Sequence, residues 1–469
     1  MMNKSIREFP KSVVMGLVCL GMSNFSVAGN RPDDLPNIVF FLVDDFGKGA
    51  LQSMGSDLHE TPNIDRLAES GMRFTDGYAA CTVCSPSRAA ILTGRYPGRT
   101  RITNWIPGNA RKNAKLKIPD WQMHMEHDWL LLPEALKKSG YTTGFFGKWH
   151  LMPVKDKKGM QEHFPANHGF DVNIGGREWG HPKGRGKYFH PFDMPNVESK
   201  PGDYLTDRLT DYAVDFIAQN KEAPFLLYFS YYTVHRPIMG RPDLVEKYKR
   251  KLATGEYDQS NPAYAAMVES LDMSVGRVMT ALEDRGLEKN TIVIFTGDNG
   301  AAYHAYTGGF RNRKGFSHEG GVREPVIFSW PGVIKGGTTS DVPMTGTDYY
   351  PTLLDLSGLP LEKDQHVDGI SLAPVLRGET AVMPERSLFW HYPHYHRTNP
   401  YGAIRKGKWK LIEFFEDGAL ELYDLEKDRA ETTNLVESEP EVVKALLQEL
   451  KDWRTSVDAQ MPTPAVNAE

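Results

Sequence analysis

The chain is poor in cysteine, and this scarcity limits how the fold can be stabilised. Among its 469 residues there are three cysteines, Cys19, Cys81 and Cys84. Small secreted domains that depend on disulfides carry a much denser set of cysteines. We therefore expect a large packed core, and not covalent cross-links, to hold this protein together.

The sequence also lacks an excess of positive charge. Its 55 lysines and arginines are outnumbered by 60 aspartates and glutamates, and the formal net charge is -5. This balance makes the chain a poor candidate for nonspecific nucleic-acid binding, so we expect no nucleic-acid partner. If the protein acts on an anion, its positive charge must be concentrated locally.

Long apolar runs are missing as well. The apolar stretch 13–22 follows a basic N-terminal region and precedes the small residues 26–28. This is the pattern of a secretory signal peptide over residues 1–28, and the stretch is too short to be a stable transmembrane anchor. We expect a mature chain without a membrane span that is periplasmic or secreted.

Strand-like and helix-like segments alternate through most of the sequence. The predicted buried strands are Asn37–Val43, Thr142–Phe146, Phe225–Ser230, Thr291–Thr296 and Val326–Trp330. Helical patterns lie between them, for example at 204–219 and 264–282. The alternation predicts an α/β fold with a large, mostly parallel sheet sandwiched by helices.

The pattern changes after about residue 376. Short strands are predicted within 401–412 and 420–424, followed by an amphipathic helix from about Glu441 to Trp453. We therefore expect a smaller C-terminal domain of antiparallel sheet plus helix. The predicted organisation is a signal peptide at 1–28, a catalytic domain at 29–375 and an α+β subdomain at 376–469.

Polar motifs follow four of the predicted strands. Asp44-Asp45 comes after the first, 147–150 after the second, 235–237 after the third and 297–300 after the fourth. Ligands of α/β sheets collect beyond the carboxyl ends of the strands, so we expect these motifs to share one site. Taken singly, such pairs are also common in solvated loops and turns.

Four of these residues offer only oxygen ligands. They are Asp44, Asp45, Asp298 and Asn299. Hard oxygen donors without histidine or cysteine favour calcium, with magnesium as the second choice.

One short motif points to a family. Cys84-Ser85-Pro86-Ser87-Arg88, continued by Leu92-Thr93-Gly94-Arg95, resembles the modification signal of type I, formylglycine-dependent sulfatases in the alkaline phosphatase superfamily. The chain resembles the bacterial polysaccharide and arylsulfatase-type enzymes, clearly over 37–355 and more loosely beyond. The other readings of Cys84 are a small buried hydrophobe, or a disulfide or redox partner of Cys81.

The resemblance implies a covalent mechanism. Cys84 would be oxidised to formylglycine by a formylglycine-generating or anaerobic sulfatase-maturating enzyme, and the aldehyde would hydrate to a geminal diol. One hydroxyl attacks the sulfur of a sulfate ester, and the second lets the aldehyde re-form and expel sulfate. One calcium would be bound by Asp44, Asp45, Asp298 and Asn299 together with the modified Cys84.

The resemblance also assigns the cations and histidines. Arg88 would hold the diol and the metal ligands, and Lys148 and Lys314 would bind sulfate. His150 would be the base that deprotonates the second hydroxyl, and His235 the acid that protonates the leaving alcohol.

Two segments rich in histidine, arginine and aromatic residues, 177–190 and 390–397, suggest a sulfated polysaccharide or oligosaccharide as the substrate. The predicted sugar contacts are Arg177, His181, His304, Arg311 and His394. Packing at a domain interface is the alternative for both segments.

Three other functions stay open from the sequence. A phosphodiester or phosphonate monoester hydrolase of the same superfamily usually carries histidine where this chain has Asn299, which favours sulfate. The other two are a small aryl sulfate hydrolase and a carbohydrate-binding protein on an inactive sulfatase scaffold.

Overall fold

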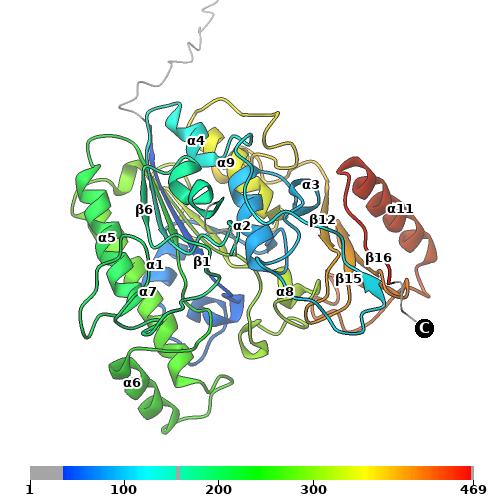
Figure 1. The fold of residues 1–469 in the computed structure, drawn as a ribbon, viewed down its shortest axis with the longest axis horizontal. Coiled ribbons are helices and arrows are strands. Elements are labelled where there is room, and N and C mark those ends of the chain that lie inside the picture. Colours follow the sequence, from blue (N-terminus) through cyan, green and yellow to red (C-terminus); the bar gives the residue numbers. More distant parts are fainter. Residues whose placement is uncertain (1–34, 155–158, 466–469) are drawn as a thin grey trace, which may run out of the picture.

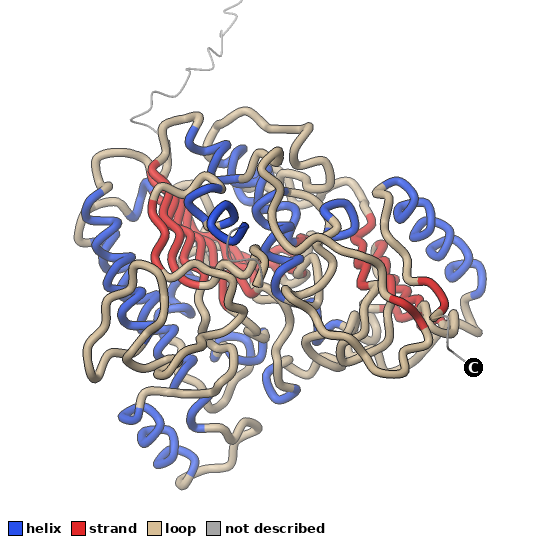
Figure 2. Tube along the Cα trace, viewed as in Figure 1, coloured by secondary structure: helices blue, strands red, loops and turns tan. Residues whose placement is uncertain are grey.

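The computed structural model describes residues 35–154 and 159–465. A large sheet lies between two layers of helices, and a smaller sheet stands beside it (Figures 1 and 2). The predicted signal peptide falls outside the described residues. No described helix is both long and apolar enough to cross a membrane.

The large sheet has eight strands in the order β10-β2-β9-β8-β1-β7-β5-β6. Their bounds are β1 Asn37–Val43, β2 Met72–Phe74, β5 Thr142–Gly147, β6 Val172–Ile174, β7 Phe225–Ser230, β8 Thr291–Gly297, β9 Val326–Ser329 and β10 Thr338–Ser340. The five strands from β8 to β6 run parallel. Their carboxyl ends therefore meet at one edge of the sheet, as expected.

One predicted strand departs from the parallel arrangement. The run at 326–330 forms β9, but it pairs antiparallel with both β8 and β2. Its apolar composition shows that it is buried, whereas its direction depends on the path of the intervening chain. The prediction of a mostly parallel sheet is confirmed.

Alternate residues of β1 explain why both faces of this sheet are covered. Ile38, Phe40 and Leu42 point into one apolar cluster, and the intervening residues of the strand point into another. Helices α2, α4 and α9 pack on the first face, and α1, α5 and α7 on the second (Figure 1). The main helices are α1 Pro62–Glu69, α2 Cys84–Thr93, α4 Leu132–Lys137, α5 Leu205–Gln219, α6 Pro242–Leu252, α7 Pro262–Glu283, α8 Glu319–Val322 and α9 Tyr349–Leu356.

The C-terminal part forms an antiparallel sheet of four strands and one long helix. The elements are β12 Ser387–Tyr392, β13 Tyr401–Lys406, β14 Trp409–Phe414, β15 Leu420–Asp424 and α11 Pro440–Ser456. Val443, Leu446 and Leu450 of α11 pack on one face of the sheet. The prediction of antiparallel sheet plus helix is confirmed, although β12 was not predicted as a strand.

Candidate active site

The parallel strands bring the predicted motifs to one edge of the sheet. Asp44 and Asp45 follow β1, and its two neighbours β7 and β8 lead to His235 and Asp298. β5, which is next to β7, ends at Gly147, where φ is 101° and an added Cβ would lie 2.0 Å from the Ser230 oxygen. Only glycine fits this turn, so it sets the path of the chain into the Lys148 segment.

Helix α2 brings the cysteine to the same place. Cys84 is its first residue, and all ten residues of the helix are buried. Arg88 lies about one turn further along, so both side chains project toward the sheet edge. Cys81 and Cys84 are both free thiols in the structure, so the alternative interpretation of a disulfide between them is not supported.

Arg88 connects three strand ends, since it bonds Asp298 after β8, Lys148 after β5 and Ser230 at the end of β7. Its Nε donates to an Asp298 carboxylate oxygen at 2.9 Å, and its Nη1 donates to the Lys148 carbonyl at 2.9 Å. The side chain is 2% exposed. A buried guanidinium with fixed acceptors is rigid, so it can hold its carboxylate partner in a defined position.

Two lysines approach the carboxylates from different sides. Lys148 Nζ donates to Asp44 Oδ2 at 2.6 Å. Lys314 Nζ contacts Asp45 Oδ1 and lies 3.1 Å from the Cys84 sulfur. Both ammonium groups therefore lie next to the carboxylate cluster, and that of Lys314 also lies next to the cysteine.

The carboxylate cluster fits a hard cation. Ligand atoms of Asp44, Asp45, Cys84 and Asp298 lie within 4.8 Å of one another. The buried Oδ1 of Asn299 has no hydrogen-bond partner among the described residues, while its Nδ2 donates to Asp45 at 2.8 Å. An unsatisfied buried amide oxygen beside three carboxylates is the donor set that calcium prefers.

Titration in this cluster follows from its burial. Burial raises the pKa of Asp44 to about 8, with Lys148 opposing the rise and Asp298 adding to it. Burial would also raise the pKa of Asp45, but Lys314 and His235 lower it well below its usual value. A cation bound among these groups would favour the charged form of Asp44.

Burial raises the pKa of the Cys84 thiol to about 12, although Lys148 and Lys314 oppose the rise. An unmodified thiol here is therefore protonated at neutral pH and is a poor nucleophile.

The hydrogen bonds of His150 select one tautomer. Its Nε2 lies 2.5 Å from the Ile106 carbonyl oxygen, which can only accept, so Nε2 carries the proton. Its Nδ1 is buried and makes no hydrogen bond with the part of the chain that the structure describes. Burial and Lys148 lower the pKa of His150 well below its usual value, which leaves a neutral ring with a free lone pair.

His235 is oriented through its other nitrogen. Its Nδ1 lies 2.8 Å from the Arg236 carbonyl oxygen and donates to it. Its Nε2 is thereby directed to the site, 3.5 Å from Asp45 Oδ2. The two histidines thus present different nitrogens to the same space.

Backbone strain is concentrated at the site. Asp45 has a φ of 59° and His150 a φ of 57°. A left-handed conformation costs a non-glycine residue about 1–2 kcal/mol. Strain of this kind persists where the surrounding contacts fix the side chain, and it is typical of functional sites.

A pocket of about 230 Å³ opens above these groups. Its floor includes Asp45, Cys84, His150, His235 and Lys314. Its rim includes Trp105, His181, Lys183, Arg236, Tyr303, His396 and Arg397. The rim therefore combines aromatic surfaces with positive charge, while the floor holds the reactive groups.

The structure places the five predicted sugar contacts differently. His181 lines the pocket, with its ring stacked 5.6 Å from that of His235. Arg177 lies over Trp179 and bonds Glu178, and His304 is exposed on a short helix. Of these, only His181 is among the residues that line the pocket.

The remaining two predicted contacts pack within the protein. His394 is buried, and its Nε2 lies 2.8 Å from Thr103 Oγ1. Arg311 donates to the Tyr423 hydroxyl and the Glu431 carbonyl, so it ties the large domain to the C-terminal sheet. Both side chains therefore pack between the two parts of the chain and do not line the pocket.

Sequence reasoning did not single out four basic residues of the rim. His396 and Arg397 lie in the histidine-rich segment, and Lys183 lies between the residues singled out in the other one, so both segments do reach the pocket. Arg236 follows His235 directly in the sequence. Its position next to a candidate catalytic residue could have identified it as part of the pocket.

Comparisons with known proteins agree with this geometry. A family model described as Sulfatase matches residues 36–359, and one described as N-sulphoglucosamine sulphohydrolase, C-terminal, matches residues 308–456. The chain therefore belongs to the sulfatase family. It is a sulfuric ester hydrolase.

Several relatives are similar over most of the chain. A sulfatase of Formosa agariphila is 32% identical, covering 100% of this chain and 97% of the relative. The N-acetylgalactosamine-6-sulfatase of Mus musculus is 36% identical over 80% of this chain and 71% of its own length. The crystal structure of Ps i-CgsB in complex with k-i-k-neocarrahexaose is 27% identical with a TM-score of 0.75, covering 91% of this chain and 94% of that one.

Proposed function

We propose that this sulfatase hydrolyses sulfate esters on a sulfated carbohydrate, with Cys84 converted to formylglycine and one calcium ion held beside it. The observation that carries this proposal is the Cys84 sulfur, buried 3.1 Å from Lys314 Nζ on the floor of a basic pocket. Its thiol is protonated there, which suits a side chain that acts only after modification.

The ligands for the cation are Asp44, Asp45, Asp298 and Asn299, together with the modified Cys84. The formylglycine supplies the nucleophile, and calcium supplies positive charge next to the sulfate oxygens. Arg88 holds Asp298 by a hydrogen bond from Nε to Oδ2 and by an ion pair of Nη2 with the same oxygen. Lys148 and Lys314 bind the sulfate group, and Lys314 stands close to the bond that breaks.

The two histidines divide the proton transfers. His150 offers the free lone pair of its Nδ1 and is the proposed base. His235 has its Nδ1 proton engaged with the Arg236 carbonyl, so its Nε2 is the nitrogen that faces the pocket. Burial lowers the pKa of His235, but Asp45, 3.5 Å from Nε2, opposes this and favours the imidazolium. In that charged form Nε2 carries the proton for the leaving alcohol, and His235 is the proposed acid.

The rim of the pocket supports a saccharide substrate. His181 and Lys183 enter from one segment, and His396 and Arg397 from another. Basic side chains can pair with further sulfates or carboxylates, and Trp105 and Tyr303 offer flat surfaces for sugar rings. The mouse relative and the neocarrahexaose complex carry carbohydrate substrates or ligands in their names, which also supports this choice.

The alternatives have less support. A phosphonate or phosphodiester hydrolase usually places histidine at the position of Asn299, whose free oxygen here suits a calcium ligand. A small aryl sulfate would leave most of the basic rim unused. A maturation enzyme is the proposed partner, and the predicted signal peptide favours export to the periplasm or beyond.

The decisive experiment is mass spectrometry of the peptide that contains Cys84, combined with a sulfate-release assay. The protein should be produced with a formylglycine-generating enzyme and assayed with calcium on sulfated saccharides, an aryl sulfate and an aryl phosphate. We expect the cysteine-to-aldehyde mass change at Cys84 and sulfate release from at least one saccharide. Matured protein that releases no sulfate from any saccharide would refute the proposal.

Two cysteine variants provide a matched pair. Cys84→Ala should lower kcat/KM by more than about 1000-fold, because the nucleophile is lost. Cys81→Ala removes a buried thiol outside the pocket and should keep most of the activity. Equal loss in both variants would show that packing, and not the nucleophile, is responsible.

A rim variant tests the carbohydrate assignment. Arg397→Ala should raise KM for the sulfated saccharide at least about tenfold, since a charged hydrogen bond is worth about 1.5–3 kcal/mol. It should leave KM for a small aryl sulfate almost unchanged, because that substrate does not reach the rim. Equal effects on both substrates would contradict the assignment.

A further inference from the structure

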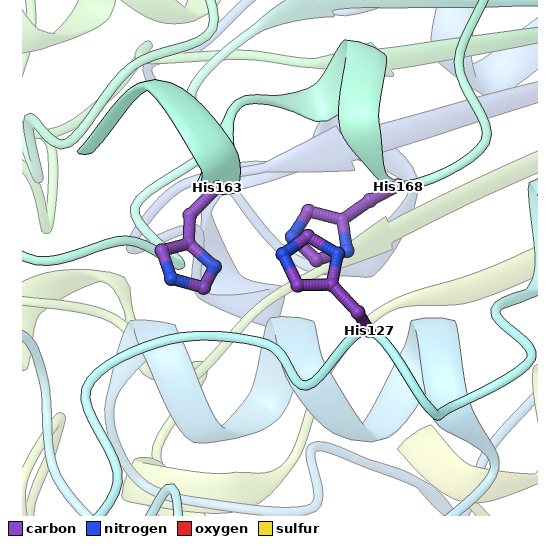
Figure 3. Close-up of side chains that lie close together, drawn as sticks. All are labelled: His127, His163 and His168. Atoms are coloured by element: carbon purple, nitrogen blue, oxygen red, sulfur yellow. The ribbon is translucent and has the colours of Figure 1, made fainter. Parts of the chain in front are cut away.

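A group of histidines lies apart from the carboxylate site and has no role in the proposed mechanism. His127 belongs to the loop between β4 (Leu116–Lys117) and α4. His163 ends the short helix η4 (Gly159–His163), and His168 follows the next one, η5 (Pro165–Asn167). Figure 3 shows the three rings facing one another from these separate segments.

The rings are close enough to share a ligand. One nitrogen of each of the three lies within 4.8 Å of the others. The rings of His127 and His168 are stacked with centroids 4.8 Å apart, and those of His127 and His163 are 5.2 Å apart. His127 is exposed, so an ion from solvent can reach the group.

Two of the nitrogens lack a hydrogen-bond partner among the described residues. His168 is 1% exposed and its Nε2 has no hydrogen bond with any described residue. His163 is 9% exposed, and its Nδ1 is also unpaired within the described ranges. An unsatisfied buried polar atom costs about 1–3 kcal/mol, so simple packing does not explain two on neighbouring rings.

The protonation state suits a metal. Burial, with repulsion from neighbouring histidines, lowers the pKa of His163 to about 4 and that of His168 to about 3. Both rings are therefore neutral at pH 7 and have lone pairs available. Neutral imidazole is the form that binds zinc and other late transition metals.

We propose that His127, His163 and His168 bind one transition-metal cation of the zinc class. The site is separate from the calcium site, whose ligands are oxygens. Nitrogens of a tetrahedral zinc site are about 3.3 Å apart, so binding turns the stacked rings inward until their lone pairs converge. Water completes the coordination on the exposed side.

Such a metal would stabilise the segment that carries the catalytic groups. Trp149 stands between Lys148 and His150; its ring lies 5.8 Å from that of His168, and its Nε1 donates to the His163 carbonyl at 2.9 Å. A metal that joins η4 and η5 to the loop of His127 would hold in place the side chains that pack on Trp149. The metal would act through structure and would not touch the substrate.

The test uses the full mature chain with calcium in excess, so that the carboxylate site is occupied. Zinc is added alone and counted after desalting, and cobalt is titrated while its visible absorption is recorded. We expect one zinc per chain and a cobalt spectrum typical of tetrahedral nitrogen ligation. His127→Ala should weaken binding more than about tenfold, whereas His190→Ala, outside the group, should not.

Since His127 is exposed, its variant should fold, and thermal melting checks this. His168→Gln is a second variant, and anomalous diffraction at the zinc edge locates the ion directly. The proposal is overturned if no zinc is retained, if His127→Ala retains it equally, or if the anomalous peak lies among the aspartates. The result is independent of the sulfatase assay, because metal content is measured without turnover.

Discussion

At the scale of single residues, Lys314 contacts both a proposed metal ligand and the proposed nucleophile. Its ammonium contacts both Asp45 and the Cys84 sulfur, and these carboxylate and sulfur atoms raise its pKa well above the usual value against the effect of burial. The lysine is therefore charged throughout the physiological range. In the proposed mechanism, a fixed positive charge beside the breaking bond would stabilise the transition state.

Lys314→Met tests this role. The variant keeps the length of the side chain but loses the charge, so kcat/KM should fall by about 100- to 1000-fold. The exposed Lys363, outside the pocket, gives the control Lys363→Met, which should keep its activity. Steady-state kinetics measure both, and thermal melting in calcium separates catalysis from folding. A loss below about tenfold would contradict the assigned role.

At the scale of elements, the packing of α2, the helix that begins at Cys84, depends on the glycine that ends it. The helix stops at Gly94, whose φ is 66°. A Cβ there would lie 2.4 Å from the His366 Cβ and 2.8 Å from its Cα. The glycine thus provides both the left-handed turn and the close packing of α2.

A matched pair of glycines separates these two effects. Gly286 has a φ of 67° and nothing within 4 Å of an added Cβ. Gly286→Ala should cost about 1 kcal/mol for the backbone alone. Gly94→Ala should cost about 1–3 kcal/mol more because of the clash. Denaturant unfolding measures both, and equal costs would show that the packing around Gly94 relaxes freely.

At the scale of the whole molecule, buried ion pairs join the C-terminal sheet to α8 and to the chain around Asp76. Lys410 of β14 contacts Glu319 of α8 at 2.8 Å and Glu431 at 3.1 Å, and none of the three side chains is exposed. Arg405 and Arg323 both pair with Asp76 in the same interface. Removing one partner from such a group leaves a buried charge uncompensated.

Lys410→Met should therefore destabilise the protein by about 3–5 kcal/mol. Lys406 pairs with Glu449 at the surface with 42% of its side chain exposed, and Lys406→Met should cost at most about 1 kcal/mol. Both values come from denaturant unfolding at neutral pH. Similar costs for the two lysines would contradict the importance of the buried group.

The cost of Lys410→Met should depend on pH. Burial raises the pKa of Glu319, but Lys410 and Arg323 outweigh this and bring it from 4.5 to about 2. A lowered carboxyl pKa stabilises the fold above pH 4.5 and loses this contribution as the pH falls toward 2. The difference between wild type and variant should shrink when unfolding is measured at about pH 3. A constant difference would be inconsistent with the pairing.

The sequence by itself determined the family, the parallel strands at the centre of the sheet and the motif residues at their ends. It could do so because these features are local: an apolar run and the polar residues that follow it are neighbours in the chain. The modification motif is likewise continuous, from Cys84 to Arg95.

Only the tertiary structure decided the direction of β9, the basic rim of the pocket and the meeting of three histidines. His394 and His396 are two residues apart in a similar context, yet the first is buried against Thr103 and the second lines the pocket. His127 and His168 come together because separate segments of the chain pack against each other, with His168 next to Trp149. Contacts of this kind depend on side-chain direction and on distant parts of the chain, and neither is recorded in local sequence.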